Sequence, residues 1–139
     1  MAAEAGERPL IRGTDFVFLP TRSFERSYDF YFGLLGLECS SRYGNEVGGE
    51  FETGSMTIQV IDVAKIGRRF EASSGAIAFR VDDVEAARSQ LEAHGVEFVG
   101  KTFDSGVCHQ AVFADPDGNH LILHHRYAPR DARPPQRST

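Results

Sequence analysis

The chain carries the same arrangement of predicted elements twice, and this internal repeat restricts its possible folds more than any other feature. Residues 15–38 predict a strand, a helix and a return strand, and residues 75–97 predict the same order sixty positions later. The segment Val17-Phe18-Leu19 corresponds to Ile77-Ala78-Phe79 at that offset. We therefore expect a duplicated unit whose two copies have the same local structure.

Both predicted helices have recognisable start and end signals. In the first copy Ser23 is a suitable N-cap, because its hydroxyl can accept a hydrogen bond from a free backbone N–H group. Gly36 stands where a C-cap glycine belongs. In the second copy Asp82 or Asp83 occupies the N-cap position and Gly95 ends the helix. The sequence thus predicts one continuous helix in each copy.

Further strands are predicted after each helix, and they set the organisation of the chain. They span residues 37–43, 48–53 and 55–63 in the first copy, and 96–101, 107–114 and 120–126 in the second, where residues 115–119 form a strong turn. A unit of roughly fifty residues buries too little surface to be stable alone, so the two should pack as a pair. We expect a flexible arm at 1–12, a first βαβββ module at 13–63, a linker at 64–74, a second module at 75–126 and a disordered tail at 127–139.

Composition excludes several classes of protein. With 139 residues, 41% of them hydrophobic, the chain can form one domain with a substantial core. Its net charge of -5 argues against a nucleic-acid-binding surface. No apolar run is long enough to span a membrane, and the N-terminus lacks the apolar core of a signal peptide. Cys39 and Cys108 have neither disulfide nor metal spacing, so we expect reduced thiols and a cytoplasmic location.

Three short motifs resemble the glyoxalase/bleomycin-resistance/dioxygenase, or vicinal-oxygen-chelate, superfamily. They are Ser23-Phe24-Glu25-Arg26-Ser27 with Leu35-Gly36-Leu37, the run Ile77-Ala78-Phe79-Arg80-Val81-Asp82-Asp83-Val84, and Asp115-Pro116-Asp117-Gly118-Asn119. The resemblance implies an α+β fold of two tandem βαβββ modules, with curved mixed sheets around a cleft, and a homodimer. The run Leu19-Pro20-Thr21-Arg22-Ser23-Phe24 is similar to the bleomycin-resistance branch in particular.

The same resemblance indicates four positions where metal-dependent members of the superfamily carry ligands. In this chain those positions hold Phe16, Gln59, Ala76 and Ile122. Three of the four side chains have no donor atom, whereas a catalytic metal ordinarily needs three protein ligands. We therefore expect neither a metal nor another cofactor at this site.

Strand alternation then predicts which side chains line the cleft. If the four positions face the cleft, their neighbours Val17, Leu19, Ile58, Val60, Ile77, Phe79, Leu121 and Leu123 face the helices, and all eight are apolar. The predicted ligand-binding residues are Phe16, Phe18, Thr57, Gln59, Ala76, Arg80, Gln110, Ile122 and His124. Aromatic walls with a few polar groups are typical of a ligand site.

The histidines offer a different possibility. If the last hairpin closes symmetrically about Asp117, Gln110 faces His124 and His109 faces His125. The His109–His125 pair could hold a metal if a third ligand were present, although strand-end histidines are more often simply exposed. His120 and His124 are about 13 Å apart along a strand, too far to share a metal.

These observations favour a metal-free protein that sequesters an aromatic or antibiotic-like small molecule near a dimer interface, with no nucleic-acid or membrane partner. One alternative is an enzyme, either a lyase or dioxygenase with a relocated metal or a metal-free isomerase using His109 or His124. A scaffold or regulatory module, with the cleft filled by its own side chains, is a third possibility.

Overall fold

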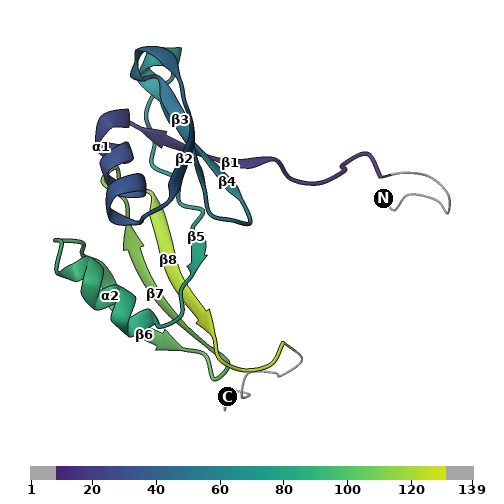
Figure 1. Ribbon diagram of the computed structural model, residues 1–139, viewed down its shortest axis with the longest axis vertical. Helices are drawn as coiled ribbons and strands as arrows, with labels where there is room; N and C mark the ends of the chain where they lie inside the picture. Colours follow the sequence, from purple (N-terminus) through teal and green to yellow (C-terminus); the bar gives the residue numbers. More distant parts are fainter. Residues whose placement is uncertain (1–8, 131–139) are drawn as a thin grey trace.

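The duplicated pattern corresponds to two four-stranded sheets in the computed structural model, which describes residues 9–130 (Figure 1). The first sheet has the order β1-β4-β3-β2, from β1 (Phe16–Thr21), β4 (Thr57–Asp62), β3 (Gly48–Glu52) and β2 (Glu38–Arg42). The second has the order β5-β8-β7-β6, from β5 (Ile77–Arg80), β8 (His120–Arg126), β7 (Cys108–Ala114) and β6 (Phe98–Asp104). In each sheet the first strand pairs in parallel with the last, and the other pairs are antiparallel. The predicted α+β fold of two βαβββ modules is confirmed.

The first predicted helix differs from the expected single helix. Ser23 is its N-cap and accepts a hydrogen bond from the backbone N–H of Arg26, and Gly36 ends it at a φ of +76°. Between them, however, α1 (Phe24–Tyr28) continues into the π-helix η1 (Asp29–Leu34), where the Leu35 N–H bonds to the Phe30 carbonyl. A π turn contains one more residue than an α turn, and an apolar stripe of this length does not distinguish the two.

The second helix and the strand after it also refine the prediction. Asp83, not Asp82, is the N-cap of α2 (Val84–Glu92). Strand β6 was expected to end at residue 101 but continues to Asp104, because the pairing shifts register between Val99 and Phe103. Gly100 lies in that interval with a φ of +69°, a conformation that glycine adopts without steric cost.

A single core joins the two modules on the helical faces of the sheets. Figure 1 shows α1 and α2 on the same side of the molecule. The predicted inward-facing residues are buried or half-buried, as alternation requires. The core combines side chains of both modules, among them Leu19, Phe24, Tyr31, Phe51 and Ile58 of the first and Leu91, Phe113, Leu121 and Leu123 of the second.

The turn at residues 115–119 connects the modules through buried hydrogen bonds. The Asp115 carboxylate accepts from the Tyr31 hydroxyl at 2.6 Å. The Asp117 carboxylate accepts from the Thr21 hydroxyl, and from the Arg26 guanidinium at 2.7 Å. Asn119 donates to the Pro20 carbonyl at 2.9 Å. The turn, which we call the 115–119 latch, therefore fixes the start of the first helix to the second module.

Tyr31 should make stability depend on pH in the alkaline range. Burial, and then the neighbouring Asp115 carboxylate, raise the pKa of this phenol far above its ordinary 10.0. The folded state thus holds the Tyr31 proton more tightly than the unfolded state does. The stability that protonated Tyr31 contributes is therefore complete below pH 10 and declines as the pH rises above it. In urea titrations, Tyr31→Phe should lose about 1–2 kcal/mol at pH 8 but decline less steeply than the natural chain above pH 10. Equal slopes for the two proteins would contradict this assignment.

Both ends of the chain lie partly outside the described residues. The predicted arm is described from residue 9 and the predicted tail up to residue 130. Within the tail, Tyr127 packs its ring on His109 and donates its hydroxyl to Asp104 at 2.9 Å. No helix in the described part of the chain has the length and apolar character needed to cross a membrane.

Candidate functional site

The outer face of the first sheet, away from the helices, presents two exposed aromatic side chains. Phe16 and Phe18 alternate with inward-facing residues of β1 and remain 50% and 37% exposed. Their partners on the adjacent strand β4 are Thr57 and Gln59 respectively. Four of the predicted site residues therefore share one face, which we call the Phe16–Phe18 face.

A polar network continues this face across the neighbouring strands. Gln59 donates to the Tyr43 hydroxyl at 3.1 Å, and that hydroxyl donates to Glu50 at 2.6 Å. Glu52 accepts from Thr57 at 2.6 Å and also from Ser40. Polar groups of defined orientation thus lie beside exposed aromatic rings, as in many ligand sites.

The pKa values in this network follow from its hydrogen bonds. Partial burial, and then donation to Glu50, raise the pKa of the Tyr43 phenol, so it stays a neutral donor. The Ser40 and Thr57 hydroxyls lower the pKa of Glu52, so that residue remains a carboxylate. We did not predict Ser40 or Tyr43 from the sequence, whereas the alternation Glu50-Phe51-Glu52 in β3 agrees with both glutamates lying on the outer face.

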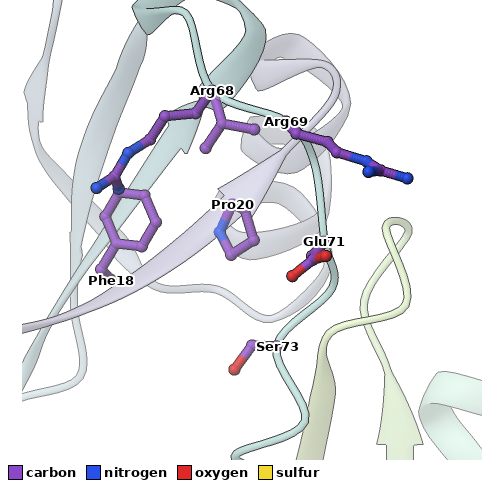
Figure 2. A pocket seen from close by; sticks show the side chains of 7 residues that line it. Phe18, Pro20, Arg68, Arg69, Glu71 and Ser73 are labelled. Atoms are coloured by element: carbon purple, nitrogen blue, oxygen red, sulfur yellow. The ribbon is translucent and has the colours of Figure 1, made fainter.

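At the edge of the first sheet the Phe16–Phe18 face meets a pocket of about 390 Å³ (Figure 2). Phe18 and Pro20 of β1 form one wall, and the segment after the 3₁₀ turn η3 (Val63–Ile66) forms the other. The residues that this segment contributes are Arg68, Arg69, Glu71 and Ser73. This pocket was not predicted, since residues 64–74 showed no periodicity and were expected to be only a linker.

The remaining predicted residues lie on the second sheet. His124 pairs with both Arg80 and Gln110, and Ile122 pairs with Ala78 and Val112, all on the outer face. Ala76 is exposed just before β5. The structure thus divides the predicted site residues into two groups, and the pocket beside Phe18 contains members of the first group alone.

The residues present do not fit a metal at the positions that the resemblance indicates. Phe16, Ala76 and Ile122 have no donor atom, which leaves Gln59 alone. Within residues 9–130, no group of three or more histidine, cysteine, aspartate or glutamate side chains is placed to hold a metal ion. These positions therefore supply too few ligands for a catalytic metal.

The predicted pairing of His109 with His125 is present, but the two imidazoles have different partners. The His109 Nε2 atom lies 3.4 Å from Asp104, whereas the His125 Nδ1 atom lies 3.1 Å from the Val81 carbonyl oxygen. The Gly106 N–H group and the Tyr127 hydroxyl lower the pKa of Asp104. Each histidine thus has its own protein partner at the end of the hairpin.

Comparison with known proteins agrees with this architecture. Residues 13–123 match the family model described as the Glyoxalase/Bleomycin resistance protein/Dioxygenase superfamily. A glyoxalase/bleomycin resistance protein/dioxygenase from Nocardioides has a similar structure, with a TM-score of 0.70 and 24% identity over 94% of this chain and 93% of that one. Among curated proteins, no sequence matches the chain significantly.

Two further solved structures are similar at lower identity. Lactoylglutathione lyase from Agrobacterium tumefaciens has a TM-score of 0.68 and 17% identity, over 84% of this chain and 95% of its own. A superfamily member from Sphaerobacter thermophilus has a TM-score of 0.69 and 20% identity, over 84% of this chain and 98% of its own. At such identities the likeness concerns the fold alone.

Proposed function

The chain belongs to the glyoxalase/bleomycin resistance protein/dioxygenase superfamily, and within it we propose a metal-free binding protein of the bleomycin-resistance type. Its ligand is an aromatic small molecule that is sequestered rather than converted. The ring stacks on Phe16 and Phe18, and Gln59 supplies a hydrogen bond that fixes its orientation. A similar structure carries the name lactoylglutathione lyase, but Phe16, Ala76 and Ile122 argue against metal-dependent chemistry at these positions here.

The observation that carries this proposal is the exposure of two phenylalanine rings on one strand face. Isolated exposed apolar residues are common, but two on adjacent outward positions of a strand, beside an ordered polar network, form a prepared contact surface. Covering a phenylalanine side chain contributes about 1.5–3 kcal/mol, and an aromatic partner adds about 0.5–1.5 kcal/mol. A planar ligand therefore gains most of its binding free energy from this face.

A homodimer is part of the proposal, because the outer faces of both sheets are uncovered in the described chain. The second sheet exposes Val99 and Phe103, and its outer face carries Arg80 and His124. The first sheet carries Glu50 and Glu52 on its outer face. Apolar patches with opposite charge suit the association of one copy's first sheet with the other copy's second sheet, which would enclose the ligand between them.

The test is a thermal-shift screen with a broad panel of aromatic natural products and antibiotics, because specific binding to the folded state raises the melting temperature. A compound found in this way should bind Phe18→Ala at least about tenfold more weakly by calorimetry. Phe32→Ala is the matched control, since Phe32 is 47% exposed but stacks on Tyr28 in the first helical segment. Its affinity should be unchanged.

Two outcomes would count against sequestration. If no compound in the panel raises the melting temperature, the Phe16–Phe18 face is not a ligand site. If a bound compound is recovered chemically altered, as mass spectrometry would reveal, the protein is an enzyme. Stoichiometric transition metal in the purified protein would also favour the enzyme.

A further inference from the structure

We infer that Arg68 and Phe18 together form a subsite for the carboxylate of an aromatic acid. This inference rests on the proposed function and names the class of its ligand. It concerns the pocket at the edge of the first sheet, where an aromatic ring and a guanidinium group line the same space (Figure 2). Such a pair can accept a planar ring and its acidic substituent at the same time.

The backbone that carries Arg68 is fixed on both sides. Gly67 turns the chain at a φ of +74°, and the Arg68 N–H group donates to the Val63 carbonyl at 2.9 Å. Further along, Phe70 is covered by the Arg22 guanidinium at 4.1 Å. The Ser73 N–H group donates to the Asn119 side chain at 2.8 Å. The segment is therefore a preformed wall, and a ligand need not order it on binding.

The guanidinium of Arg68 is available for a ligand. Among residues 9–130, neither Arg68 nor Arg69 forms an ion pair, although Glu71 lines the same pocket. Figure 2 shows the Arg68 side chain extending toward Phe18, whereas that of Arg69 extends in the opposite direction. An arginine can bind a carboxylate through two parallel N–H···O hydrogen bonds, which is the geometry that planar acids require.

Charge on the sheet fixes the direction in which such an acid lies. Strand β1 is at the edge of the sheet, and Glu50 and Glu52 lie on β3, two strands away from Phe18. Two strand spacings amount to about 9–10 Å. A ligand carboxylate is repelled by these two glutamates and also by Glu71, which Figure 2 shows on the other side of the pocket from the Arg68 guanidinium. Arg68 attracts it, so the acid points toward this guanidinium at the edge while its ring covers Phe18. The 390 Å³ of the pocket is enough for a small aromatic acid.

The experiment compares 2-naphthoate with 2-naphthamide, which share a ring system and differ in charge. Calorimetry on the full-length protein should give an affinity about tenfold higher for 2-naphthoate, the margin expected of one charge-assisted contact. Arg68→Ala should remove this preference and leave the affinity for 2-naphthamide unchanged. Arg69→Ala removes the same charge one residue away and should keep the preference.

The other outcomes distinguish a failure of the carboxylate subsite from a failure of the proposed function. If both compounds bind the natural chain equally and Phe18→Ala weakens both, the proposed function stands and the carboxylate subsite is wrong. If Arg68→Ala and Arg69→Ala lower 2-naphthoate affinity equally, the effect is general attraction and the subsite is likewise wrong. If neither compound binds, the subsite is wrong, and the separate panel decides the proposed function. Unchanged melting temperatures would verify that both variants are folded.

Discussion

Replacing Asp117 by alanine should lower the free energy of unfolding by about 3 kcal/mol, because the buried Thr21 hydroxyl and the Arg22 backbone N–H group lose the carboxylate that accepts from them. The Asp117 side chain is 0% exposed and accepts hydrogen bonds from the Arg26 guanidinium, the Thr21 hydroxyl and the Arg22 backbone N–H group. Alanine leaves these donors without their acceptor inside the 115–119 latch. The buried Thr21 hydroxyl loses its charged acceptor, whereas the Arg26 guanidinium is 47% exposed and can be hydrated, so most of the loss comes from the buried groups.

Urea unfolding at neutral pH measures this change. Glu92→Ala is a suitable control, because Glu92 pairs with Arg88 across one turn of α2 but is largely exposed. Arg88 is only 17% exposed but keeps its hydrogen bonds to Thr102 and to the Gly100 carbonyl, so Glu92→Ala should stay within about 0.5 kcal/mol of the natural chain. If the two variants lost similar amounts, the latch would not hold the modules together.

Replacing Gly48 by alanine should also lower the free energy of unfolding by about 3 kcal/mol. The added methyl group has no free space, and the backbone around it cannot move aside. A Cβ atom at Gly48 would meet the backbone oxygen of Val60 and, at 2.7 Å, the Cδ1 atom of Ile61. Val60 belongs to β4, which is paired on both sides within the first sheet. The clash could therefore be relieved only if the paired strands β3 and β4 separated.

Gly44→Ala is the matched control for this glycine, only four residues earlier. No atom lies within 4 Å of a Cβ at Gly44, and its φ is not in the left-handed range. Alanine there should keep or slightly raise stability, by about 0.4–1 kcal/mol, because it reduces the freedom of the unfolded chain. Equal melting temperatures for the two variants, measured by circular dichroism, would show that β3 and β4 pack more loosely than the structure indicates.

Most of the fold could be predicted from the sequence, because local patterns of residues are enough to recognise it. Apolar alternation placed Leu19 and Ile58 inside and Phe16 and Phe18 outside, and hairpin symmetry about Asp117 paired His109 with His125 correctly. Period and symmetry are properties of neighbouring residues, so they can be recognised without knowledge of tertiary contacts. The same information cannot distinguish a π turn from an α turn, so the helix between Ser23 and Gly36 was predicted but its π segment was not.

The site was less predictable because its important contacts join distant parts of the chain. Arg68 is brought to Phe18 by a segment without periodicity, and that segment is held in place by Asn119, forty-six residues from its partner Ser73. Likewise, the turn at 115–119 was recognised as a turn, but its bonds to Thr21 and Tyr31 bridge more than eighty residues. No local pattern records such pairings.

The latch also makes the two copies of the repeated unit unequal. In the first copy the turn that corresponds to it lies between β3 and β4, where the Thr53 side chain bonds only to Ser55 and Met56. Insertions or new chain ends at that first turn would disturb local bonds, whereas the same changes at residues 115–119 would break hydrogen bonds between the two modules. The hairpin of the first copy can therefore change in length without disturbing the contact between the modules, whereas its counterpart in the second copy cannot.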